Sequence, residues 1–280
     1  MAVTFFGHAP EFGKFETYDF GEFQIIYRFE RPKKRSKRFS VHFKEGFFVF
    51  YLSSFNLLDP LSIETFVKSR KKWFKNVLDE YRSRLEAAFV ISEKFEKEKV
   101  IPYLGEDIPY FVEIGKKRSA TIAPGGLKIT IRSSDAEESD YERMSIIKKI
   151  LKGWYTEAFQ EELQSIARET ARRVCPEDLS ESLCFGVMES VAKWGDYTKR
   201  KKCLLGEDEL FVTQMIRINR QMAYYDRDLL NAVICHELAH IKHPNHGKRF
   251  YQLLEKYCPT WKKEEVRLKA LSPKNDFLSL

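Results

Sequence analysis

Long apolar runs are absent from this sequence. Nowhere in its 280 residues is there a stretch approaching the roughly eighteen consecutive apolar residues that a membrane-spanning helix needs. The opening segment, MAVTFFGHAPEFGKF, also lacks the charged-then-apolar layout of a secretory signal. A hydrophobic content of 43% is still enough to bury a substantial core. We therefore expect a cytoplasmic, globular protein of one or two domains that has no contact with membranes.

Cysteine is scarce and poorly placed for cross-linking. The five cysteines are odd in number and widely spaced, and none belongs to a C-x-x-C pair. This pattern argues against a disulfide framework and against a zinc site built on thiolates. We expect reduced, mostly buried thiols at these positions, which are Cys175, Cys184, Cys203, Cys235 and Cys258.

Acidic residues are fewer than basic ones. The sequence has 41 Asp and Glu against 48 Lys and Arg, which gives a net charge of +7. Basic residues gather at 31–38, 68–75, 115–119 and 199–202. Runs of this kind are most often solvated helix faces or hairpin tips, although they can also attract nucleic acid. Nucleic-acid association through these clusters is therefore the less favoured interpretation.

Strand and helix signals alternate along the first part of the chain. Aromatic and β-branched residues predict antiparallel strands over 23–55, and apolar residues at helical spacing predict a helix over 62–88. Two more strands around 124–126 lead into a second long helix that ends at Cys175. The tetrapeptide Lys-Lys-Arg-Ser occurs in both strand regions, at 33–36 and 116–119, and hints at a duplicated strand-strand-helix unit extending to 175.

The last part of the chain predicts a small sheet followed by helices. Strands are expected over 184–194 and 209–220, on either side of the polar stretch 196–208. The second of these strands could be a sheet edge to which an extended peptide adds by backbone hydrogen bonds. It leads into a helix that we expect to end near Lys242, before Pro244.

Together these signals predict an α+β protein. Antiparallel β hairpins with a long helix would occupy 1–140, and 141–280 would form a core in which the helix before Pro244 packs on a small sheet.

The helix expected before Pro244 contains the segment His236-Glu237-Leu238-Ala239-His240. Residues four apart lie on one face of a helix, so His236 and His240 can bind the same metal ion. Glu237 lies beside the ion rather than on it, where a carboxylate can take a proton from metal-bound water. The spacing therefore favours a hydrolytic zinc site over histidines without a metal.

A catalytic zinc usually has three protein ligands and one open position, so a third ligand is needed. We predict His246, because the break at Pro244 lets the chain turn off the helix axis and back toward the ion. His243 is an alternative on the same helix face, a turn further along. Glu255 is another, since His-His-Glu sites also occur. A donor for the oxyanion is required too, and Tyr251, Tyr257 and Arg249 are candidates that the spacing does not separate.

The segment HELAHIKHPNHGKRFYQLLEKYCP closely resembles the signature of the YgjP-like metallopeptidase family, which is related to SprT-like and minigluzincin-type zinc peptidases. Other family segments follow in the same order over nearly the whole chain. The resemblance implies zinc ligation by His236, His240 and His246, catalysis by Glu237, and a zincin-like α+β core. The matching segments are KSRKKW at 68–73, PYLG at 102–105, Trp194-Gly195 and RIN at 217–219.

The chain departs from the family pattern after Trp194-Gly195. Relatives usually continue after Trp194-Gly195 with Ser-Cys, whereas this chain has Asp196-Tyr197 and the basic stretch KRKKCLLGEDE, which could line the cleft. The histidine spacing also matches metzincins, but His243 stands where they need glycine, and no methionine after Met222 could form a Met-turn. We therefore exclude a metzincin.

Two functions of different classes fit these observations. The first is a zinc endopeptidase that acts on a peptide or protein substrate. The second is a DNA-associated auxiliary module that retains a zinc site without peptidase activity. Glu237 favours the first, because a purely structural zinc has no use for a carboxylate beside it. Hydrolysis of a non-peptide amide would use the same water chemistry and is a weaker third option.

Overall fold

The computed structural model describes residues 11–32, 40–44, 46–52, 60–180, 182–203 and 210–279. The chain forms two compact units, Met1–Ser83 and Arg84–Leu280. Both combine helices with small sheets, as the sequence predicts. No helix in the described residues is both long enough and apolar enough to cross a membrane. The functional division into 1–140 and 141–280 stays a prediction.

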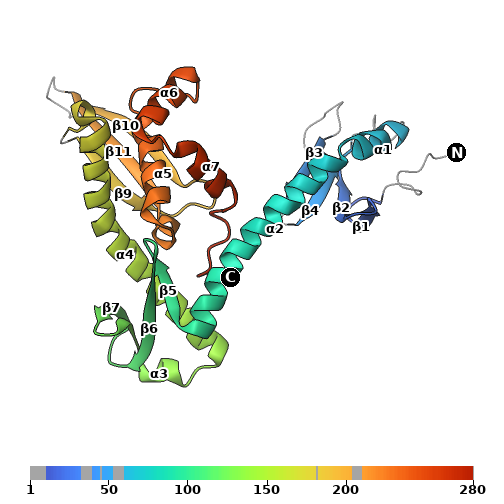
Figure 1. Ribbon diagram of the computed structural model, residues 1–280. Helices are drawn as coiled ribbons and strands as arrows, with labels where there is room; N and C mark the ends of the chain where they lie inside the picture. Colours follow the sequence, from blue (N-terminus) through green and yellow to red (C-terminus); the bar gives the residue numbers. More distant parts are fainter. Residues whose placement is uncertain are drawn as a thin grey trace. The chain divides into compact units, whose positions relative to one another are not determined.

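The first unit contains a four-stranded sheet with the order β1-β2-β4-β3 (Figure 1). The outer pairs are antiparallel, and the central pair β2–β4 is parallel. Phe74 of the following helix is fully buried against Phe48 and Phe50 of the sheet. The elements are β1 (Phe15–Asp19), β2 (Gln24–Glu30), β3 (Ser40–Lys44), β4 (Phe47–Tyr51), α1 (Pro60–Ser69) and α2 (Lys71–Glu93).

The helix predicted over 62–88 is two helices, α1 and α2, which meet at Arg70. The basic run 68–75 lies at this junction, and α2 continues beyond the predicted end to Glu93. Of the basic run 31–38, only residues 31 and 32 are among the described residues.

A second four-stranded sheet opens the second unit, with the order β5-β6-β8-β7. Its outer pairs are antiparallel and its central pair β6–β8 is parallel, so the two four-stranded sheets share one topology. The duplication itself stays a prediction. The elements are the π-helix η2 (Lys94–Glu98), β5 (Val100–Tyr103), β6 (Glu106–Ile114), β7 (Ser119–Ala123), β8 (Gly126–Ile131) and α3 (Ser133–Ala136).

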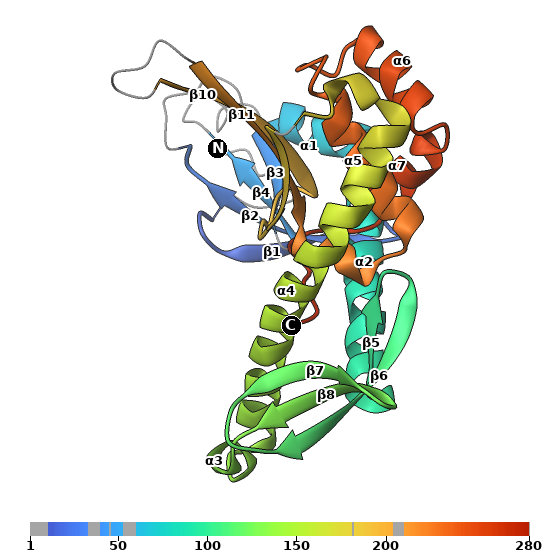
Figure 2. The same cartoon turned by 90° about the vertical axis from the view of Figure 1, so that its left-hand side faces the viewer.

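The long helix α4 (Asp140–Val174) connects the two sheets of the second unit (Figure 2). Ser139 caps it by accepting a hydrogen bond from the Glu142 amide. The Glu142 carboxylate in turn accepts a hydrogen bond from the Ser139 hydroxyl. Apolar side chains four residues apart form its buried stripe, which contacts β7, β8 and β9 in turn. The stripe consists of Ile147, Leu151, Tyr155, Phe159, Leu163, Ala167 and Ala171.

The sheet beside the histidine helix has the order β10-β11-β9. Two expectations are wrong here. The polar stretch 196–208, expected only to separate two strands, contains a strand of its own, because β10 runs from Gly195 to Cys203. The strand predicted over 209–220, β11, is the central strand rather than an edge. The strands are β9 (Leu183–Met188), β10 (Gly195–Cys203) and β11 (Leu210–Asn219).

The histidine helix α5 (Arg227–Ala239) begins at Asp226, whose carboxylate accepts a hydrogen bond from the Leu229 amide at 3.0 Å. The helix ends at Ala239, three residues before the predicted end, and a tighter turn continues to Lys242. The remaining elements are η3 (Pro176–Asp178), η4 (Arg220–Tyr224), α6 (Lys248–Tyr257) and α7 (Trp261–Lys269).

Candidate metal centre

Three histidine rings meet where α5 ends. His236 and His240 lie one turn apart on α5, with ring centroids 5.0 Å apart. His246 returns from the segment after Pro244 and brings its Nε2 to within 2.9 Å of Nε2 of His236. One nitrogen from each of the three rings lies within 4.8 Å of the others, and among the described residues no other group of His, Cys, Asp or Glu meets this criterion.

The donor set fits a zinc ion. Two ligands of a tetrahedral zinc, each about 2.0–2.1 Å from the metal, lie roughly 3.4 Å apart, which is close to the spacing found here. His240 Nδ1 lies 3.1 Å from the carbonyl oxygen of His243, so Nδ1 carries the proton and Nε2 is left as the metal-binding atom. Phe250, which is fully buried, packs against all three rings at centroid distances of 4.9, 4.7 and 4.7 Å.

Burial keeps two of these histidines neutral. Desolvation, together with the neighbouring His240 and His246, lowers the pKa of His236 to about 4. Desolvation also lowers the pKa of His240. Neutral imidazole is the form that binds a metal, so neither ring has to lose a proton near neutral pH.

Glu237 lies on the same turn of α5 and is buried, with 6% of its surface exposed. Desolvation, followed by the negative charge of Asp196, raises the pKa of its carboxyl group to about 8 in the metal-free protein. Its neighbour is the backbone of Gly195 at the start of β10. A Cβ atom at Gly195 would lie 2.7 Å from Oε1 of Glu237 and 2.8 Å from its Cγ. Only glycine therefore fits at position 195 without moving Glu237.

The two alternative third ligands lie outside this cluster. The carbonyl oxygen of His243 orients His240, and the His243 ring is not part of the group of three. The Glu255 carboxylate accepts hydrogen bonds from Lys262 at 3.0 Å and from Trp261 Nε1 at 3.3 Å. The geometry therefore brings His246 to the pair on α5, while its role as a metal ligand stays a prediction.

The predicted oxyanion donors occupy three different environments. Tyr251 lines the same pocket as His236 and Glu237, with its ring 6.3 Å from that of His246. Tyr257 is buried in the core, and desolvation raises its pKa to about 12. Arg249 is exposed on α6. Tyr251 is thus the candidate that shares the pocket with the histidine site.

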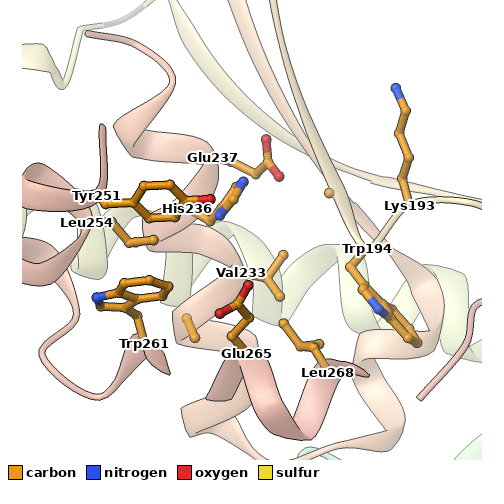
Figure 3. Close-up of a pocket in the computed structure, with 12 residues that line it drawn as sticks. Lys193, Trp194, Val233, His236, Glu237, Tyr251, Leu254, Trp261, Glu265 and Leu268 are labelled. Carbon is orange, nitrogen blue, oxygen red and sulfur yellow. The ribbon is translucent and has the colours of Figure 1, made fainter. Parts of the chain in front are cut away.

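A pocket of about 300 Å³ adjoins His236 and Glu237 (Figure 3). Its walls come from α5, α6 and α7, together with residues 193–195 at the start of β10. Neither Gly195 nor this pocket was predicted to be part of the site. Trp194-Gly195 was the available signal, since that pair recurs in the family pattern.

The model of the family described as YgjP-like, metallopeptidase domain, matches residues 56–271 of the chain. The matched segment contains the three histidines, Glu237, Gly195 and every wall of the pocket. No curated protein and no solved structure matches the chain.

Proposed function

We propose that this chain, which belongs to the YgjP-like metallopeptidase family, hydrolyses peptide bonds with a zinc ion held by His236, His240 and His246. Membership of the family supports a metallopeptidase. The observation that carries the finer proposal is the convergence of three imidazole nitrogens within 4.8 Å, one residue from a buried carboxylate. Cys175, Cys184, Cys235 and Cys258 have free thiols, which suits the cytoplasmic setting that we also propose.

Each residue of the site has a separate role in the proposed reaction. A zinc ion held by His236, His240 and His246 would supply a Lewis acid for the scissile carbonyl and for the attacking water. Glu237 accepts the proton of the attacking water and passes it to the leaving amine. The carbonyl of His243 holds the His240 ring in one orientation. Gly195 leaves room for the Glu237 carboxylate to face the reacting atoms.

We also propose that an extended substrate pairs with β10. This strand is an edge of its sheet, and it begins at Gly195, directly against Glu237. An exposed edge offers free backbone groups to an added strand. A peptide lying along the start of β10 would therefore pass the carboxylate. This arrangement replaces the predicted pairing with residues 209–220, which form the central strand.

Metal content tests the proposal. The protein is purified without chelator and without a histidine tag, and zinc is measured by elemental analysis in wild type, His246→Ala and His243→Ala. We expect about one zinc per chain in wild type and in the matched control His243→Ala, and a large loss in His246→Ala. Glu237→Gln should keep the zinc and lose cleavage of an unstructured protein substrate.

Three results would contradict the proposal. Wild type that takes up no zinc on reconstitution would remove the basis for a zinc peptidase. Loss of zinc in His243→Ala rather than in His246→Ala would reassign the third ligand. Cleavage that survives in Glu237→Gln would exclude this carboxylate as the general base. Nucleic-acid association through the basic clusters stays a prediction, and no contact among the described residues favours it over peptidase activity.

A further inference from the structure

The pocket beside Glu237 has a markedly apolar lining (Figure 3). The apolar lining residues include Ala232 and Val233 of α5, Leu254 of α6 and Leu268 of α7. Its volume of about 300 Å³ is at the lower end of the range for ligand pockets, which is roughly 300–1,000 Å³. A space of this size suits one side chain rather than a folded segment.

Aromatic rings extend this lining and are held in place by their neighbours. The rings of Tyr251 and Trp261 stack with centroids 5.2 Å apart and an interplanar angle of 24°. Trp261 is fixed further by its Nε1, which donates to Glu255 at 3.3 Å. On the other side, Trp194 packs edge-on against Tyr225 at 5.9 Å. These walls are formed before a substrate arrives, so little side-chain ordering is needed on binding.

The charged groups at the pocket do not favour binding of a charged substrate side chain. Glu265 lies between Trp261 and Leu268, but its Oε1 is 3.2 Å from the ammonium group of Lys269. The ammonium group of Lys193 points away from the apolar walls. Glu237 is the other acidic residue at the pocket, and neither Glu237 nor Glu265 offers a favourable partner to an acidic side chain.

We propose that this pocket binds a large uncharged side chain, aromatic or branched aliphatic, of the substrate residue next to the scissile bond. The inference rests on the proposed peptidase function and adds the substrate class to it. The enzyme then cleaves beside Phe, Leu or a similar residue and discriminates against Gly, Asp and Glu at that position. Leu268 and Trp261 determine the preference through contact, since neither residue takes part in the chemistry.

The test is a binding series that does not depend on the metal. Acetylated amino-acid amides of Gly, Leu, Phe and Arg have no strong metal-binding group, and the Glu amide is compared in metal-free protein because its carboxylate can bind zinc. Calorimetry measures the affinity of the series for metal-free and zinc-loaded protein. We expect the Phe amide to bind about ten-fold or more tightly than the Gly amide, because burying a large apolar side chain has this effect. Peptides that vary at the same residue should show the same order of kcat/KM.

Two variants of α7 provide the matched comparison. Leu268→Trp fills the pocket, so the advantage of Phe over Gly should fall to about two-fold. Val266→Trp adds the same ring to the same helix at a position that is 67% exposed and outside the pocket, and it should keep the wild-type preference. The wild-type series is informative on its own, so the test survives if Leu268→Trp fails to fold.

The outcomes separate the two proposals. Equal affinity for all five amides would overturn the pocket assignment and would not affect the proposed zinc peptidase function. Tightest binding of the Arg amide, lost in Glu265→Gln, would overturn it in favour of a cation site. Preferential binding of the Phe amide by a protein that takes up no zinc would support the pocket and overturn the proposed chemistry.

Discussion

At the scale of single residues, the site depends on the absence of a side chain at Gly195. Gly195→Ala would bring a Cβ to 2.7 Å from Oε1 and 3.0 Å from Cδ of Glu237, so the carboxylate would have to move. Displacing a catalytic group by about 1 Å can cost about 100-fold in rate. We expect kcat/KM to fall by about that factor while the zinc content stays unchanged. Gly153→Ala, where nothing lies within 4 Å of the new Cβ, is the control.

Glu237 also makes the stability of the metal-free protein depend on pH. Its pKa is raised from 4.5 to about 8, so between these values the folded state binds more protons than the unfolded state. The contribution of Glu237 to the free energy of unfolding therefore falls as pH rises from 4.5 to 8. Glu237→Gln stays neutral, and at pH 8 it should be more stable than wild type by on the order of a few kcal/mol.

Urea unfolding of the two metal-free proteins at several pH values measures this difference. The advantage of Glu237→Gln should shrink toward zero as the pH falls below 4.5, where the wild-type carboxyl group becomes protonated in both the folded and the unfolded state. A difference that stays constant with pH would show that the buried carboxyl does not titrate in this way.

The histidine positions could be predicted from the sequence, while the role of Gly195 could not. The spacing of His236 and His240 follows from helix geometry, which is local. The approach of Gly195 to Glu237 joins the start of a strand to a helix that comes later in the chain. Such a contact leaves no periodic pattern, so only the recurrence of Trp194-Gly195 in the family could have suggested it.

At the scale of elements, Asp226 anchors the helix that presents the histidines. Its carboxylate caps α5 through the Leu229 amide and accepts hydrogen bonds from Arg267 of α7, whose guanidinium also donates to buried Glu264 at 2.6 Å. The interaction with Arg267 lowers the pKa of Asp226. Asp226→Ala should destabilise the protein by about 1–2 kcal/mol, the usual loss for a helix cap.

Asp228→Ala is the matched control, because Asp228 lies in the first turn of the same helix and is exposed. Chemical denaturation of both variants measures the loss. We expect Asp228→Ala to lower the free energy of unfolding only slightly. An equal loss at both positions would mean that the negative charge near the helix start stabilises the protein, rather than the cap and the contact with α7.

Strand β10 shows why one element was mispredicted. Its sequence, GDYTKRKKC, has neither the alternation nor the apolar content of a core strand, so the sequence predicted only a polar stretch between two strands. An edge strand needs little apolar content, and lysines discourage unwanted pairing along the later part of β10 while its start at Gly195 carries none. The pairing with β11 along its whole length is a tertiary contact that residue pattern alone does not report.

At the scale of the whole molecule, every residue of the proposed site lies in the second compact unit, Arg84–Leu280. The family match begins at residue 56, so strands β1 to β4 lie outside it. The two four-stranded sheets share one topology, yet only the second belongs to the unit that carries the histidines. The first unit is therefore expected to be dispensable for metal binding.

Phe74→Ala tests this separation. Phe74 is fully buried in the core of the first unit, with its ring 4.7 Å from that of Phe48, and its loss should cost about 3–5 kcal/mol. Hydrogen exchange should then rise in β2 and β4, while zinc content and cleavage of a short peptide stay at wild-type levels. Phe159→Ala, which removes a fully buried ring from α4 in the second unit, should lower both. Loss of zinc in Phe74→Ala would show instead that the metal centre needs the first unit to be folded.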